Sequence, residues 1–240
     1  MLDRFKSLAL SFKKKLKRTA DPARHNWLSR TRPFSREFGL DRGTAIDRKF
    51  MEVFLASHQE VIQGKVLEVG DDQYTYQFGS NLSSTVILAG SDHSARSTCF
   101  PKGDLTDDQS LINLGKYDCV IATNVLNMIF DIQSAVKGLA DLVQPATGSV
   151  LATVAGLVPL SRFDYERWGD YWRFSDMSIK KLFETYFDKV DVSIYGNAPL
   201  AAAFIIGLSQ EEVPSSLFDH YDADYQILIA VKASHPRAIV

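Results

Sequence analysis

Carboxylates and a glycine surround the end of an apolar run near residue 70, where they could bind a charged ligand. Residues 65–70 read KVLEVG, with Glu68 inside the run, and Asp71 and Asp72 follow Gly70. A glycine at a turn lets the backbone approach a ligand closely, and the acidic loop favours a ligand with a cationic amino group. A GxGxxG dinucleotide motif is absent, because residues 72 and 75 are Asp and Thr. A nicotinamide oxidoreductase is therefore disfavoured, while an ordinary strand-to-loop glycine stays open as the structural alternative.

A second group of residues that could take part in binding or chemistry is an aromatic run interleaved with charged residues. It consists of Tyr165, Arg167, Trp168, Asp170, Tyr171, Trp172, Arg173 and Phe174. Aromatic faces can stack on sugar rings, and Asp or Arg can hydrogen-bond their hydroxyls, which would make Trp168, Tyr171, Trp172 and Arg173 an acceptor-binding wall. If a bound sugar or alcohol reacts through its hydroxyl group, Asp170 or a histidine is a candidate general base that takes up the proton. The alternative is a lid that packs on the sheet, with Arg173 in an ion pair.

The elements that must position these groups alternate between strands and helices. Apolar runs predict strands at 65–70, 85–90, 117–125, 149–156, 189–196 and 225–233. Helical periodicity covers about 44–62, 125–143 and 175–187, with Thr44 and Asp47 as a capping-box-like pair and Ser175 or Asp176 as an N-cap. This order predicts a doubly wound, mostly parallel α/β sheet with helices on both faces. Ligands of such sheets bind beyond the carboxyl ends of the strands.

Composition narrows the class of protein. Two charge-free stretches, 142–161 and 192–210, contain Pro, Gly, Asn or Gln and are expected to be buried strands with turns rather than lipid-facing helices. The 2 cysteines form no metal-ligand pattern, and Cys119 in its apolar run is expected to be a buried thiol. We therefore expect no metal and a reducing, cytoplasmic location.

Positive charge is concentrated at the N-terminus. Residues 1–50 carry 14 basic and 5 acidic side chains, whereas residues 51–240 carry 13 and 24, so the net charges are +9 and −11. Residues 1–43 are expected to be a basic amphipathic arm and linker, followed by one domain over 44–240. Residues 1–18 fit a helix lying on an anionic membrane surface, at the inner face of the membrane, or a solvated or partner-packed helix. No nucleic-acid-binding motif accompanies this charge, so we expect no nucleic-acid partner.

The order of these motifs resembles the class I S-adenosylmethionine-dependent methyltransferases. The segments are LEVG, GDLTD at 103–107, YDCVIATNVL at 117–126 and LVQPATGSVLATV at 142–154. The segments at 38–55, 168–175 and 195–212 resemble, more narrowly, a bacterial methyltransferase-like group associated with surface-polysaccharide and glycosyltransfer gene sets. The resemblance covers about residues 30–232.

The resemblance implies S-adenosylmethionine as cofactor and assigns roles to individual positions. Glu68 and Gly70 match the motif that contacts the amino-acid part of the cofactor, and the adjacent Asp71 is a further candidate for cofactor binding. Asp104 with Leu105 matches the segment that approaches the adenine. Asn124 matches the position facing methyl donor and acceptor, as a cofactor-binding and catalytic residue. The chain departs from the family in lacking the second and third glycines of the first motif and a clear ribose-binding acid, for which Asp92 is the nearest candidate.

Two functions follow as expectations. The first is transfer of a methyl group from S-adenosylmethionine to a small-molecule or saccharide acceptor. The second, suggested by the eroded glycine loop, is a catalytically inactive module that docks on a membrane or glycan-assembly complex. The segment 38–48 has two corresponding interpretations: a lid that brings Arg42, Asp47 and Arg48 over the cofactor crevice, or an N-terminal cap whose charges pair with the acidic body. The helix start at Thr44 and Asp47 favours the cap.

Overall fold

The fold is built on a single mixed sheet. The computed structural model describes residues 13–16, 27, 30–88 and 103–237, and within them six strands pair in the order β2-β1-β3-β4-β6-β5. The strands are β1 (Gly64–Val69), β2 (Leu82–Leu88), β3 (Cys119–Thr123), β4 (Ser149–Ala155), β5 (Phe187–Tyr195) and β6 (Leu228–Pro236). Strands β1 to β4 are parallel, whereas β6 runs antiparallel to both β4 and β5. The predicted mostly parallel α/β sheet is confirmed.

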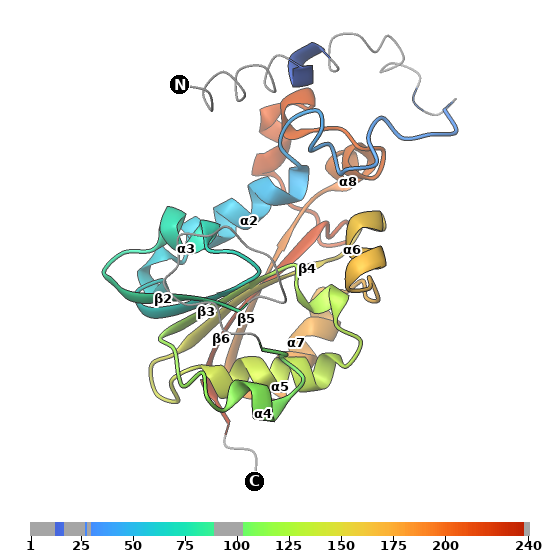
Figure 1. The fold of residues 1–240 in the computed structure, drawn as a ribbon. Coiled ribbons are helices and arrows are strands. Elements are labelled where there is room, and N and C mark those ends of the chain that lie inside the picture. The colour runs from blue at the N-terminus through green and yellow to red at the C-terminus, as the bar shows by residue number, and fades with distance from the viewer. Residues whose placement is uncertain (1–12, 17–26, 28–29, 89–102, 238–240) are drawn as a thin grey trace.

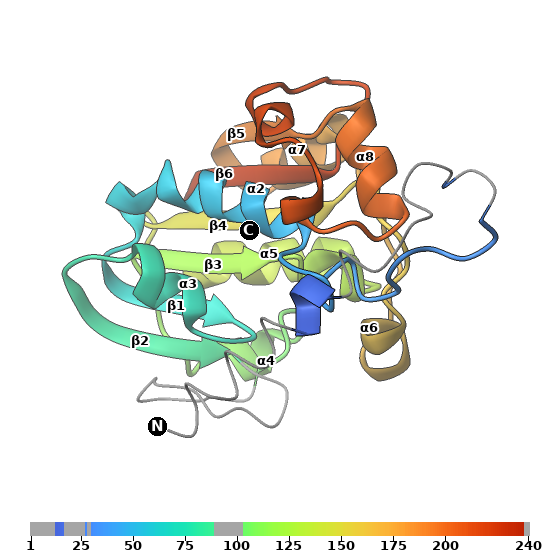
Figure 2. The ribbon, with the colours of Figure 1, turned by 90° about the horizontal axis from the view of Figure 1, so that it is seen from above.

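Helices cover both faces of the sheet (Figures 1 and 2). One face carries α2 (Ile46–Ala56), α3 (Gln73–Phe78) and α8 (Ala198–Ile205), and the other carries α4 (Asp108–Leu111), α5 (Ile132–Leu142) and α7 (Asp176–Glu184). The short helix α6 (Arg162–Arg167) lies in the connection that follows β4. Four 3-10 turns complete the described elements: η2 (Gln59–Val61), η3 (Leu126–Met128), η4 (Gln210–Glu212) and η5 (Ser215–Asp219).

Two separate apolar cores hold these layers together. All seven residues of β4 are buried, and alternate strand residues face the α5–α7 core and the α2–α8 core. A strand buried on both faces needs a continuous apolar sequence, which is why these strands were recognisable. Cys119 in β3 is fully buried, as predicted, and burial raises the pKa of its thiol.

The helix starts agree only partly with the sequence. Ser175 caps α7 in a capping box, since its side chain accepts from the Ser178 N–H, as expected. The expected cap of α2 is wrong: Ala45 occupies the N-cap position and no side chain caps the helix. Thr44 instead donates its hydroxyl to Glu211, and Asp47 turns toward β3. Thr44 is thus used in a tertiary contact, whereas the Asp47 carboxylate accepts both from Asn124 and from the Arg48 N–H in the first turn of α2.

The stretch 192–210 also differs from the buried strands with turns that the sequence predicts there. Only its first part continues β5, and residues 198–205 form α8. Asn197 accepts a hydrogen bond from the Leu200 N–H and Pro199 lies in the first turn, which are ordinary signals for a helix start. Among the described residues, no helix is long and apolar enough to cross a membrane.

Residues 30–43, expected to belong to a linker, pack on the body. The Phe34 N–H donates to the Ile206 carbonyl oxygen at 2.7 Å, and the backbone of Ser35 lies against Gly207. Arg42 forms a bidentate ion pair with Glu212. Of the predicted helix at 1–18, residues 13–16 alone lie in the described part of the chain; they are helical, and Lys14 Nζ donates to the Gly43 carbonyl oxygen.

Candidate active site at the carboxyl ends of the strands

The turn after β1 leaves open space beside its glycine. Gly70 has φ +101°, and its N–H donates to the Leu88 carbonyl oxygen at 3.0 Å, which ties the turn to β2. A Cβ placed on Gly70 would meet no atom of the described residues within 4 Å. The left-handed backbone favours glycine here. No described residue therefore blocks the approach of a ligand to the main chain of this turn.

Glu68 lies beneath this turn and holds α3. Its carboxylate accepts hydrogen bonds from the Tyr74 N–H (3.2 Å), the Thr75 N–H (2.7 Å) and Thr75 Oγ1 (2.6 Å). The residue is 2% exposed, and this burial raises its pKa to about 7, although the Thr75 hydrogen bonds act in the opposite direction. Asp71 is exposed and accepts from the Gln73 N–H. Glu68 therefore anchors the α3 turn, and Asp71 presents negative charge at its surface.

Asn124 follows β3, which is the neighbour of β1 in the sheet. It has φ +51°, an uncommon backbone conformation for a residue other than glycine. Its Nδ2 donates to Asp47 Oδ2 at 3.3 Å, and Thr153 Oγ1 donates to its Oδ1 at 3.3 Å. The structure thus joins α2, β3 and β4 through three polar side chains at one edge of the sheet.

Asp47 is the titratable member of this group. Burial raises its pKa above the usual value, opposed by the charge of Arg48 and by the hydrogen bond from Asn124. Arg48 itself donates to the Tyr74 hydroxyl at 3.0 Å. A carboxylate with a raised pKa at a strand end is a candidate proton acceptor.

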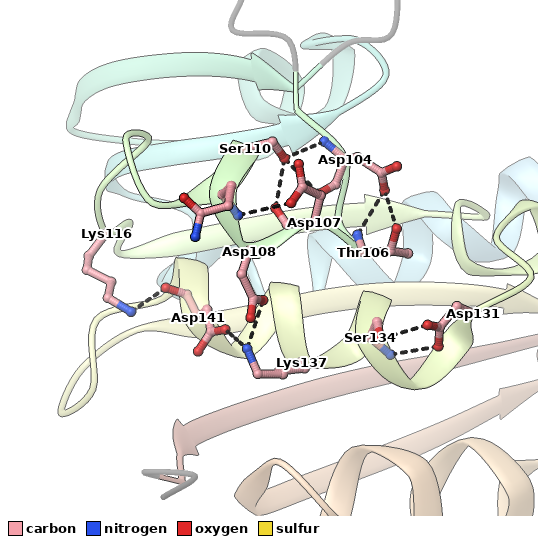
Figure 3. Close-up of polar contacts among 11 residues, drawn as sticks. Asp104, Thr106, Asp107, Asp108, Ser110, Lys116, Asp131, Ser134, Lys137 and Asp141 are labelled. Atoms are coloured by element: carbon pink, nitrogen blue, oxygen red, sulfur yellow. Dashed lines mark hydrogen bonds and ion pairs between the residues drawn. The ribbon is translucent and has the colours of Figure 1, made fainter.

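The segment expected near the adenine forms a tight turn of its own (Figure 3). Asp104 Oδ1 accepts from both the N–H and the Oγ1 of Thr106, at 2.8 Å each. Leu105 is buried in the α5 core, where Gly138 gives its carbonyl oxygen room. The local bonds of Asp104 shape this loop, whereas Asp92 lies outside the described residues.

The aromatic run divides into two clusters. Tyr171 and Trp172 pack on Phe130, with ring centroids 5.4 and 5.9 Å apart, and Trp172 Nε1 donates to the Ile129 carbonyl oxygen at 3.0 Å. Trp168 instead packs on Phe163 of α6. The first cluster joins the connections that follow β3 and β4, so it borders the strand-end edge. Phe130 is 69% exposed and Tyr171 52%, so both keep ring surface for a ligand.

Asp170 and Arg173 hold the loop that carries these rings. Arg173 donates to Asp170 Oδ1 at 2.5 Å and to Oδ2 at 2.9 Å, and also to the Pro159 carbonyl oxygen. The Ser161 N–H donates to the same carboxylate. Burial acts to raise the pKa of Asp170, but the bonds from Arg173 and Ser161 outweigh it and hold the pKa below its usual range. Asp170 is thereby a weaker proton acceptor than Asp47.

Asn127 is a site residue that the sequence did not single out. Its carbonyl oxygen accepts from the N–H groups of Tyr171 and Trp172. Its side-chain Oδ1 is buried, and within the described residues it is the one buried side-chain polar atom without a hydrogen-bond partner. An unpaired buried acceptor normally has a cause, such as a bound donor. Its signal in the sequence was a polar residue inside the apolar run VLNMIF.

Phe130 was not assigned to this site from the sequence, and Asp47 was placed near it only in the less favoured interpretation of segment 38–48 as a lid. Phe130 lies in a connection and reaches the aromatic cluster through tertiary packing. Asp47 was read mainly as a helix start. No group of three His, Cys, Asp or Glu side chains that could hold a metal occurs in the described ranges.

Comparison with known proteins places the fold. No family model and no curated protein matches the chain. Among solved structures, the CurJ carbon methyltransferase is 15% identical, with a TM-score of 0.51 over 82% of this chain. A SAM-dependent methyltransferase from Archaeoglobus fulgidus is 10% identical, with a TM-score of 0.50 over 79% of this chain and 94% of its own.

The fold is that of SAM-dependent methyltransferases. The chain spans 56% of the length of the CurJ chain. At these identities the likeness concerns the arrangement of the sheet and its helices, and activity has to be argued from the site.

Proposed function

We propose that this protein is an S-adenosylmethionine-dependent methyltransferase that acts on a small-molecule or saccharide acceptor. The observation that carries the proposal is the pairing of two neighbouring strand ends. The open Gly70 turn follows β1, and the Asn124–Asp47 pair follows β3. Ligands of open α/β sheets bind at this edge.

The cofactor side of the site fits an amino-acid moiety. Gly70 leaves room at the main chain, and the exposed Asp71 supplies negative charge for an ammonium group. S-adenosylmethionine, when bound, supplies an electrophilic methyl group. In this proposal Gly70 and Asp71 bind its amino-acid part, with Glu68 holding the turn, while Asp104 and Leu105 border the adenine and Asp92 is the candidate partner of the ribose.

The acceptor side is assigned to the aromatic cluster and the polar residues beneath it. Tyr171 and Trp172 offer stacking faces, with Trp168 at α6 as an outer wall, and Asn127 Oδ1 can accept a hydrogen bond from an acceptor hydroxyl or amine. Asn124 would orient the acceptor. We assign proton removal to Asp47, because the ion pair with Arg173 leaves Asp170 suited to positioning the loop.

Ligand-induced stabilisation tests the cofactor site. S-adenosylhomocysteine at about 100 times its Kd should add about 2.7 kcal/mol to the free energy of unfolding, which raises the Tm by several degrees for a chain of this size. Gly70→Arg places a side chain in the open space and should abolish the rise. Gly115→Arg is the matched control, because Gly115 is an exposed glycine with φ +75° before β3, at the opposite end of that strand. An equal rise in Gly70→Arg would refute the site.

A catalytically inactive docking module is the second candidate. It is favoured by the sequence DDQY at 71–74, where a glycine-rich loop would be expected. The same measurement of the Tm distinguishes the two candidate functions. Absence of stabilisation by millimolar cofactor or product favours the docking module, whereas turnover with any methyl acceptor eliminates the docking module. In either case we propose a cytoplasmic protein that meets the inner face of the membrane through residues 1–18. Polysaccharide biosynthesis in a bacterium is the context that the sequence resemblance suggests.

A further inference from the structure

A groove lies between residues 30–34 and the end of α8. Its volume is about 290 Å³, and its walls include Trp27, Arg30, Arg32, Phe34, Ile205 and Ile206. The hydrogen bond from the Phe34 N–H to the Ile206 carbonyl oxygen sets its floor. In Figure 1 this segment lies beside α8, on the face of the sheet opposite α5 and α7. The residues that line the groove are different from those of the candidate active site.

Two arginines give the groove its chemistry. The Arg30 guanidinium lies over the Phe34 ring, 4.3 Å from its centroid, and Arg30 Nε donates to the Arg32 carbonyl oxygen at 3.4 Å. Arg32 is exposed. Stacking on an aromatic ring orders a guanidinium, and its planar fork of N–H groups matches the oxygens of a phosphate. The ligand indicated by these side chains is an anion with phosphate-like oxygens.

Apolar side chains beside the arginines are also exposed. Trp27 is 38% exposed and Ile205 49%. Tryptophan is enriched where a protein meets the membrane interface, and exposed aliphatic side chains can insert between lipid headgroups. A soluble anion would use the arginines but not this apolar surface. The combination favours a lipid headgroup.

Three described acidic side chains of segment 30–43 and η4 have partners inside the protein. Glu212 pairs with Arg42, Asp41 accepts from Ser35 Oγ, and Glu211 accepts from Thr44. Glu37 is exposed, but so are Arg32, Arg36, Lys13 and Lys15. Among the described residues of this segment, exposed basic side chains thus outnumber exposed acidic ones.

We propose that this groove binds an anionic phospholipid headgroup and docks the protein on an anionic membrane. A nucleic acid is the weaker occupant, because residues 51–240 carry a net charge of −11 that would repel an extended polyanion. The site extends the proposed membrane contact of residues 1–18 to different residues, and it does not depend on methyl transfer. The groove holds the phosphate on Arg30 and Arg32, with Trp27 and Ile205 in the interface.

Sedimentation with lipid vesicles tests the proposal on the full chain. Wild type should bind vesicles of phosphatidylcholine mixed with phosphatidylglycerol, and bind phosphatidylcholine alone far less. The double variant R30Q/R32Q should bind the mixed vesicles about 30-fold more weakly, as expected for two basic residues near an anionic surface. The matched control is R162Q/R167Q, which also removes two arginines that lie over aromatic rings, those of Tyr165 and Phe163. It should bind like wild type.

The remaining outcomes each decide the proposal. Unchanged binding in R30Q/R32Q, or equal loss in the control, overturns it, as does the absence of binding in wild type. If K13Q/K15Q loses binding while R30Q/R32Q keeps it, the N-terminal helix rather than the groove is the contact. Ile205→Ser leaves the net charge unchanged. Weaker vesicle binding by this variant would therefore measure the contribution of the exposed apolar side chains. Stabilisation by S-adenosylhomocysteine should be the same in R30Q/R32Q and wild type, so failure here is distinct from failure of the methyltransferase proposal.

Discussion

The buried carboxyl of Glu68 should make stability depend on pH in a way that one substitution removes. Its pKa in the folded protein is raised to about 7 from 4.5. The folded state therefore holds this proton at pH values where the unfolded chain has released it. Stability contributed by the group is full below pH 4.5 and is lost as the pH rises through about 7.

The size of the effect follows from that difference in pKa. Between 4.5 and about 7 lie about 2.5 pH units, and each is worth 1.36 kcal/mol, so the total is about 3 kcal/mol. Most of it, about three quarters, should be lost between pH 5 and pH 8. In Glu68→Gln the side chain no longer titrates but keeps its shape and one oxygen acceptor for the α3 N–H groups. We expect this part of the pH dependence to vanish.

Urea unfolding at pH 5 and pH 8 measures this directly. The free energy of unfolding of wild type minus that of Glu68→Gln should fall by about 2–3 kcal/mol from pH 5 to pH 8. Groups that titrate in both proteins cancel in this difference. Glu166→Gln, at an exposed glutamate of α6, serves as the matched control and should follow wild type. A difference that does not change with pH would refute the reasoning, because it would mean that the carboxyl titrates alike in folded and unfolded chains.

Two further substitutions test the packing around the site. Arg42→Gln leaves the Glu212 carboxylate buried without its ion pair, in which the two side chains are 4% and 1% exposed. We expect a loss of about 3–5 kcal/mol, seen as a lower urea midpoint, and a substantial recovery in the double variant R42L/E212L; an unshifted midpoint would contradict the pairing. Ser175→Ala removes the cap of α7 and should cost about 1 kcal/mol in the same assay. Ser175→Asp should recover most of that loss, and equal effects of both variants would argue against a capping role.

Much of the architecture was predictable because apolar runs and helix-capping residues are local patterns in the sequence. The continuous apolar runs of β3 and β4 marked strands covered on both faces, and their alternation with helices indicated a parallel sheet. The cap of α7 was equally clear from Ser175. Helix α8 was missed even though Asn197 and Pro199 are start signals, because an apolar stretch of this length also fits a buried strand.

The candidate site was only partly predictable, because its members come from distant segments. Glu68, Gly70 and Asn124 were found since each follows or ends a strand. Asp47 was assigned to a helix start, yet its partner Asn124 is 77 residues away. No local pattern distinguishes a carboxylate that caps its own helix from one that faces another strand.

The sequence by itself determined the six strands, the helices α2, α5 and α7, the buried thiol of Cys119 and the glycine at the β1 turn, since each depends on neighbours along the chain. Only the tertiary structure decided which polar groups meet. It paired Asp170 with Arg173, turned Asp47 toward Asn124, buried Asn127 Oδ1 without a partner and raised the pKa of Glu68. Such contacts depend on distance and burial, which arise only when the sheet and its helices have packed together.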